Sequence, residues 1–147
     1  AVTSAAAEGV ADLAAEVESR LRSALEAPTV QLAATATHWR ELYVAIPAGQ
    51  GTVEGFIDLC IDTEDGLIVA DYKTDALTGP ESVAAKVAEY RVQGATYVVA
   101  LEHLTRRPVV ACRFLFIGPD GVIEADIGDL AEAKAEVRQL LSIDESP

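Results

Sequence analysis

The beginning of the chain carries a hydrophobic pattern of helical period. The apolar residues recur at spacings of three and four, at Val10, Leu13, Val17, Leu21 and Leu25. Such spacing aligns apolar side chains on one side of an α-helix, and the proline at position 28 ends it. The pattern predicts an amphipathic helix over residues 10–26, whereas residues 29–38 leave helix and strand both open.

Three segments with strand periodicity follow. They cover residues 40–46 (RELYVAI), 52–62 and 67–73, and the sequences AGQG and TEDG separate them. Short connections that contain glycine join antiparallel neighbours. We therefore expect a three-stranded antiparallel meander.

The second half of the chain combines two helical patterns with an apolar stretch between them. Residues 81–104 have helical spacing with Pro80 near the first turn, and residues 130–141 are amphipathic. Between them, PVVACRFLFIG is typical of a buried strand, and VIEADI can pair back after the turn PDG. The predicted fold class is α/β, one domain over residues 1–147 with a central mixed β-sheet flanked by helices.

Two strands of the meander carry acids inside apolar surroundings. Residues two apart in a strand share a face, so Asp71 and Lys73 are neighbours. The same alternation puts Phe56, Asp58 and Cys60 on one face of the preceding strand and Ile57, Leu59 and Ile61 on the other. A hairpin that turns at residues 64–66 sets Asp58 opposite Asp71 to within about two residues.

Two facing carboxylates are costly unless a cation joins them. Like charges about 4 Å apart repel by roughly 1 kcal/mol in water and about 4 kcal/mol at an effective dielectric constant of about 20. Hard oxygen ligands suit Mg²⁺ or Mn²⁺, which also bind substrate phosphate. Lys73 can position the attacking water or neutralise charge on a phosphate. The set predicts metal-assisted phosphodiester hydrolysis, and the alternative is an ion pair of Asp71 and Lys73 on an edge strand.

Composition narrows the class of protein. The formal net charge of −13 disfavours a free-standing protein that grips nucleic acid, because phosphate binding requires clustered Lys and Arg. Cys60 and Cys112 lie in apolar stretches and predict buried thiols in a reducing compartment. Two cysteines cannot ligate an iron–sulfur cluster, which normally takes four. No apolar run approaches the roughly 18 residues that span a bilayer, so we expect a cytoplasmic protein without a membrane segment.

The order of these features resembles the RecB-type nuclease domain of the PD-(D/E)xK superfamily, found at the C-terminal end of bacterial helicase–nucleases of DNA repair. The matching elements are GFID at residues 55–58, DYKTD at residues 71–75, Gln93 with Tyr97 in a Q-x-x-x-Y helix, and WRELYV with Glu41 ahead of them. The resemblance covers residues 39–101 and implies a restriction-endonuclease-like core.

The resemblance also implies residue roles. Asp58, Asp71 and the backbone carbonyl of Tyr72 would bind the metal ion, and Lys73 would be the catalytic lysine. Gln93 and Tyr97 lie four residues apart on one helix face. In such families this pair lines the site and contacts DNA or braces the active-site loop. The alternative is an ordinary helix–sheet packing face.

One element of the family pattern is missing. RecB-type domains usually carry a metal-binding histidine on a helix before the first strand, but residues 10–26 contain none. His38 and His103 are expected in surface or capping roles. We expect the histidine-bearing helix to lie before residue 1, in a larger helicase–nuclease of which this chain is a fragment. Glu41 is a candidate to replace that ligand in part, and the alternative is a solvated edge acid.

Three functional hypotheses follow. The leading one is a Mg²⁺- or Mn²⁺-dependent DNA nuclease domain, exonuclease or endonuclease, that cuts single strands delivered by helicase domains of the same chain or of a partner subunit. Those domains would supply the basic surface that this acidic chain lacks. The second is a catalytically inactive nuclease-like scaffold or DNA-binding module, because fold does not establish function. The third, a stand-alone restriction or junction-resolving endonuclease, fits the negative charge less well.

Overall fold

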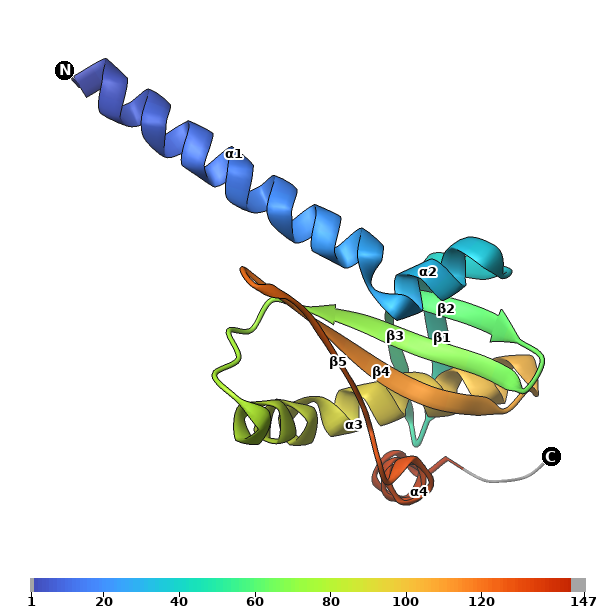
Figure 1. Cartoon of the computed structure of the whole chain (residues 1–147). Helices are drawn as coiled ribbons and strands as arrows, with labels where there is room; N and C mark the ends of the chain where they lie inside the picture. The colour runs from blue at the N-terminus through green and yellow to red at the C-terminus, as the bar shows by residue number, and fades with distance from the viewer. Residues whose placement is uncertain (1, 144–147) are drawn as a thin grey trace.

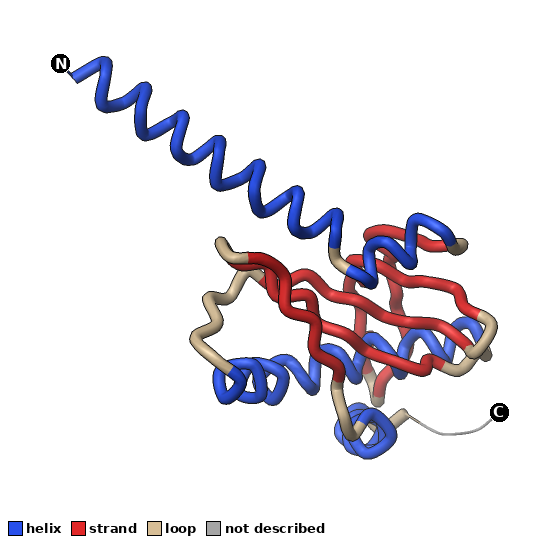
Figure 2. Tube along the Cα trace, in the orientation of Figure 1, coloured by secondary structure: helices blue, strands red, loops and turns tan. Residues whose placement is uncertain are grey.

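The computed structural model describes residues 2–143 as a mixed β-sheet with helices on both faces (Figure 1; Figure 2). The helices are α1 (Val2–Glu26), α2 (Pro28–Thr35), α3 (Pro80–Thr105) and α4 (Leu130–Leu141). The strands are β1 (His38–Ala48), β2 (Gly51–Thr63), β3 (Gly66–Lys73), β4 (Val109–Gly118) and β5 (Gly121–Asp126). This arrangement confirms the predicted α/β class.

The five strands lie side by side in chain order, β1-β2-β3-β4-β5. Strands β1, β2 and β3 form the predicted antiparallel meander, and β4 and β5 form a second hairpin. Strand β4 runs parallel to β3. A parallel pair requires a long crossover, and α3 supplies it.

Each face of the sheet has its own apolar core. On the side that we call the α3 face, α3 and α4 pack over residues that include Val69, Cys112 and Phe114. On the opposite side, the α2 face, α2 and the residue before it cover Leu59, Ile61, Ile68, Ala70 and Leu115. Both cysteines are buried and unpaired, which confirms the prediction of buried thiols.

The predicted alternation of β2 is wrong at one point. Ile57 packs with Cys60 on the α3 face, whereas Leu59 and Ile61 belong to the α2 face. The inward side of the strand therefore changes between Ile57 and Leu59, at Asp58. The partner strand changes at the same level, because Glu41 in β1 lies between the paired residues of that register and has a left-handed φ of 50°.

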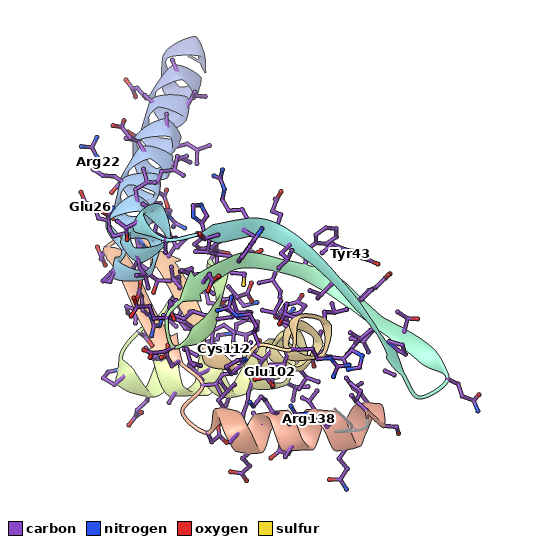
Figure 3. All side chains as sticks on the ribbon, turned by 90° about the vertical axis from the view of Figure 1, so that its right-hand side faces the viewer. Arg22, Glu26, Tyr43, Glu102, Cys112 and Arg138 are labelled. Carbon is purple, nitrogen blue, oxygen red and sulfur yellow. The ribbon has the colours of Figure 1, made fainter. Side chains whose placement is uncertain are left out.

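The two ends of β2 have different neighbours. The β2–β3 ladder stops at the pair Leu59–Ala70, while the β1–β2 ladder continues to Ala48–Gly51. The far part of the β1–β2 hairpin therefore leaves β3 and arches away from it (Figure 3). We call the point of divergence, next to Asp58, the fork.

The N-terminal segment differs from the sequence prediction in two ways. Helix α1 spans Val2–Glu26, which is longer than the predicted 10–26, and it projects from the body with only its C-terminal end near α2 (Figure 1). Residues 28–35, within the stretch left undecided, form α2. The Glu124 side chain from β5 accepts hydrogen bonds from the N–H and hydroxyl of Thr29 in its first turn, at 2.9 Å each. Within residues 2–143, none of the helices combines the length and the apolar character needed to span a bilayer.

Candidate active site

The two predicted carboxylates meet at the fork. Leu59 pairs with Ala70, so the next position in the register sets Asp58 level with Asp71. The Asp58 side chain turns toward β3, where its Oδ2 accepts a hydrogen bond of 2.9 Å from the backbone N–H of Tyr72. This bond satisfies a backbone donor that the departing strand would otherwise leave open.

Lys73 points to the same place from the end of β3. Its Nζ lies 2.8 Å from Asp71 Oδ2, and both side chains are largely buried, at 13% and 10% exposed. The same Nζ donates to Gln93 Oε1 on α3 at 2.9 Å. The structure thus brings Asp58, Asp71, Lys73 and Gln93 together.

Asp71 is an acid in a costly environment. Burial, and then the hydrogen-bonding Asp58 carboxyl, raise the pKa of Asp71 to about 6, although Lys73 acts to lower it. Its Oδ2 atom is buried and has only the ion-pair contact with Lys73, without the alignment of a hydrogen bond. Buried oxygen atoms in proteins normally accept a hydrogen bond or bind an ion or a water molecule. Asp71 Oδ2 is a suitable donor for a hard cation.

The protein donors for a metal ion are few. Across residues 2–143, no three side chains of the His, Cys, Asp and Glu types gather into a group that could hold a metal ion. Asp58 and Asp71 supply two oxygen ligands, which is within the one or two carboxylates that Mg²⁺ usually takes from proteins. The donor set therefore fits a magnesium-like ion that keeps part of its water shell.

Gln93 and Tyr97 have different surroundings although they share one face of α3. Gln93 binds Lys73, as described above. Tyr97 packs instead against Gly55 of β2: a Cβ built on Gly55 would lie 2.8 Å from Tyr97 Cε1. Among the described residues, then, Gln93 touches the lysine and Tyr97 holds the β1–β2 hairpin against α3.

Glu41 lies beside Asp58 at an open hollow on the surface. The hollow is lined by Arg40, Glu41, Asp58 and Tyr72, and we call it the fork hollow. Glu41 itself is exposed. Its left-handed backbone is uncommon for a residue other than Gly, Asn or Asp, and such strain concentrates at functional sites.

Two residues near Lys73 were missed in the sequence. The Lys73 Nζ lies 3.9 Å from the centre of the Tyr90 ring, and the Tyr90 hydroxyl donates to both oxygens of Asp75, at 2.9 and 3.1 Å. The sequence pattern treats Tyr90 only as an apolar position of its helix. The spacing in the sequence could have identified both residues. Tyr90 lies three residues before Gln93, on the same face of the helix, and Asp75 lies two residues after Lys73.

Known proteins share this sequence pattern. Residues 2–145 match the family model of the PD-(D/E)XK nuclease superfamily. A 57-residue stretch is 44% identical to an ATP-dependent helicase/nuclease subunit of Alkaliphilus oremlandii, and covers 39% of this chain and 5% of that protein. The corresponding protein of Desulforudis audaxviator is 41% identical over 71 residues, 48% of this chain and 6% of its own length. The matched stretch is thus a small part of these curated relatives.

A solved structure agrees at the level of the fold. The crystal structure of SSO0001 superposes with a TM-score of 0.51 at 16% identity, and the match covers 90% of this chain and 69% of that one. The mixed sheet with helices on both faces is consistent with a restriction-endonuclease-like core. Because the family model spans nearly the whole sequence, this chain belongs to the PD-(D/E)XK nuclease superfamily.

Proposed function

We propose that this chain is a divalent-metal-dependent DNA nuclease domain, one domain of a larger cytoplasmic helicase–nuclease of DNA repair or recombination. The meeting of Asp58, Asp71 and Lys73 at the fork carries this proposal, with Lys73 Nζ 2.8 Å from the Asp71 carboxylate. Such a set of two acids and an ammonium group is the equipment for phosphodiester hydrolysis. The similarity to helicase/nuclease proteins supports the same role.

Asp58, Asp71 and the backbone carbonyl of Tyr72 would hold Mg²⁺ or Mn²⁺. Support comes from the buried Asp71 Oδ2, which has the ion-pair contact with Lys73 but no aligned hydrogen bond among the described residues, and from the raised pKa of Asp71, about 6. When bound, such an ion would polarise the phosphate and lower the pKa of an attacking water.

Lys73 would act on the reacting phosphate. Contacts with Gln93 and with the Tyr90 ring fix its ammonium group before substrate arrives. A fixed cation in a partly buried position stabilises charge that develops on phosphoryl oxygens, because little water screens it and no reorganisation is needed. Gln93 and Tyr97 would then support the site from α3, Gln93 through the lysine and Tyr97 through the hairpin.

The substrate would be a single strand delivered by helicase domains, either of a partner subunit or of the same polypeptide. The formal charge of −13 gives this chain little general attraction for nucleic acid. A helicase motor would supply that attraction and feed the strand to the fork.

The test is cleavage of labelled single-stranded DNA with Mg²⁺ or Mn²⁺, by this chain alone and together with the helicase part of the protein. We expect Asp58→Asn, Asp71→Asn and Lys73→Gln each to lower the rate by at least about 100-fold. Asp62→Asn is the matched control, because Asp62 is another β2 acid but pairs with Arg107 away from the fork. Cleavage that survives Asp71→Asn, or no cleavage in either preparation, would overturn the proposal.

A nuclease-like fold that binds DNA without cutting it is the second candidate. The small donor set favours it, since the described part of the chain holds no group of three His, Cys, Asp or Glu side chains that could bind a metal ion. Calorimetric titration with Mn²⁺ separates the candidates. A nuclease site gives a binding signal that Asp58→Asn removes, and the non-catalytic module gives none.

A further inference from the structure

Almost all the positive charge of this chain is already neutralised. Within residues 2–143, nine of the eleven Lys and Arg side chains form an ion pair with an Asp or Glu. The two that form none there are Arg40 and Arg106. In a chain with 24 acids, an arginine without an acidic partner has its guanidinium free for an anion from outside.

Arg40 is located at the candidate active site. It lines the fork hollow together with Glu41, Asp58 and Tyr72. The hollow is open to solvent, and Arg40 is exposed.

The strained residue Glu41 explains why Arg40 points there. Leu42 packs with the core of the α3 face, while Arg40 lies with Tyr72, whose ring packs against the core of the α2 face. In a regular strand, residues 40 and 42 would share a face. The left-handed φ of 50° at Glu41 separates them, so that the arginine reaches the hollow while the leucine stays in the core. Strain of this kind costs on the order of 1–3 kcal/mol and persists where the surrounding structure supports it.

We propose that Arg40 binds a backbone phosphate of the nucleic-acid strand at the fork hollow. This inference rests on the proposed function and names the residue that seats its substrate. The planar guanidinium can donate two parallel hydrogen bonds to phosphate oxygens. A phosphate held there lies beside Asp58, so one contact fixes the strand relative to the two carboxylates. Because phosphate contacts carry no sequence information, Arg40 contributes affinity and register without base preference.

The test uses a short fluorescein-labelled oligothymidylate in EDTA, so that binding is measured without cleavage. We expect Arg40→Gln to raise the Kd about tenfold, the loss of one charge-assisted contact. The slope of log Kd against log salt concentration should fall by about 0.7, the value for one phosphate contact on a single strand.

The matched control is Arg106→Gln. Among the described residues Arg106 also has no acidic partner, but it lies away from the fork. It follows α3 near Pro108, whose carbonyl accepts a hydrogen bond from the N–H of Leu67 at the start of β3, whereas the fork lies near the end of β3. The control should change neither quantity.

A direct observation accompanies the affinity measurement. The arginine Nε–H resonances are followed by NMR while the oligonucleotide is added, and the Arg40 signal is assigned by its loss in Arg40→Gln. The proposal requires the Arg40 signal to move and the Arg106 signal to stay. A stationary Arg40 signal overturns it, whether other signals move or none does.

The nuclease assignment and the role of Arg40 can fail separately. If Arg40 binds the oligonucleotide but no metal supports cleavage, the nuclease assignment fails and the phosphate site stands. If the chain cleaves DNA and Arg40→Gln changes neither Kd nor KM, the nuclease assignment stands and the role of Arg40 is refuted.

Discussion

At the scale of single residues, the candidate lysine is held by its neighbours. Asp71 and Gln93 contact the Lys73 ammonium at 2.8 and 2.9 Å, and the Tyr90 ring lies 3.9 Å from it. The tyrosine is fixed in turn by Asp75, which Lys86 also contacts at 3.1 Å. A chain of contacts thus runs from the start of α3 to the fork and restricts the position of the amine.

Tyr90→Leu should release Lys73, whereas Tyr90→Phe should keep most of the contact, because a cation over an aromatic face gains about 0.5–2 kcal/mol from the ring. The chain has only three lysines, at positions 73, 86 and 134, so their ε-methylene NMR signals can be assigned by substitution. We expect an upfield ring-current shift at Lys73 that the Leu variant loses and the Phe variant retains. An unchanged Lys73 signal in Tyr90→Leu would contradict the stacked geometry.

Asp71 should make the metal-free protein less stable as pH rises. Its pKa of about 6 in the folded protein lies above the ordinary value of 3.8, so the folded state binds the proton more tightly. The free energy of unfolding therefore falls between about pH 4 and pH 6, by on the order of 1–3 kcal/mol. Asp71→Asn should abolish this part of the pH dependence and raise stability at pH 7. Urea denaturation in EDTA at several pH values measures it, and identical pH profiles for the two proteins would contradict it.

At the scale of elements, contact between α3 and the β1–β2 hairpin supports one side of the fork. Gly55 lets the Tyr97 ring approach the β2 backbone, with any Cβ 2.8 Å from Cε1 and 3.2 Å from the hydroxyl oxygen. Beyond it, Tyr43 and Phe56 are both exposed and pack with each other, with ring centres 5.3 Å apart. Tyr43 is labelled on the arching hairpin in Figure 3. The position of Asp58 thus depends on a helix that lies far away in the sequence.

Gly55→Ala should destabilise the protein by about 1–3 kcal/mol, because the added methyl group overlaps the ring. Gly128→Ala is the control, since a Cβ there meets nothing within 4 Å. Urea denaturation gives both values. Combining Gly55→Ala with Tyr97→Leu should cost less than the sum of the two single changes. Simple additivity would show that the ring and the glycine do not compete for space.

At the scale of the whole molecule, α1 stands apart from the two cores. The apolar stripe found in the sequence, Val10, Leu13, Val17, Leu21 and Leu25, is exposed along its length. Its ion pairs, such as Arg20 with Glu16, join residues of the helix itself, and its contacts with the body are with α2, β4 and β5. The body is joined instead by contacts between elements, including Glu102 of α3 with Arg138 of α4 at 3.1 Å, both labelled in Figure 3.

Leu21→Asp should therefore change the free energy of unfolding of this chain by less than about 1 kcal/mol. Leu59→Asp, which places a charge in the core of the α2 face, should cost more than about 4 kcal/mol or prevent folding. Denaturation at low protein concentration, followed by circular dichroism of the whole chain, compares them. A large loss of stability in Leu21→Asp would mean that the apolar stripe of α1 packs on the body.

Patterns along the chain predict the order of the strands and of the two later helices, and they set Asp58 opposite Asp71 to within about two residues. Local periodicity and turn residues carry that information, because both act between near neighbours in the chain. The sequence also identified Lys73 and Gln93 as site residues; their contact in the structure agrees with that choice, while their roles stay predictions. Residues 28–35 could not be assigned in this way, because α2 is held by Glu124, which lies 95 residues after Thr29.

The geometry of the fork depends on contacts between distant parts of the chain. At Glu41 and Asp58 the side of the strand that faces the core changes, so residues two apart no longer share a face. A prediction from alternating hydrophobic residues fails at this point, which is where β1 and β2 leave β3 together. The stacking of Tyr90 on Lys73, and the lack of an ion pair at Arg40 among residues 2–143, likewise depend on which side chains from distant parts of the chain lie within reach. Charge pairing and strain are properties of positions in space, and a pattern along the chain does not contain them.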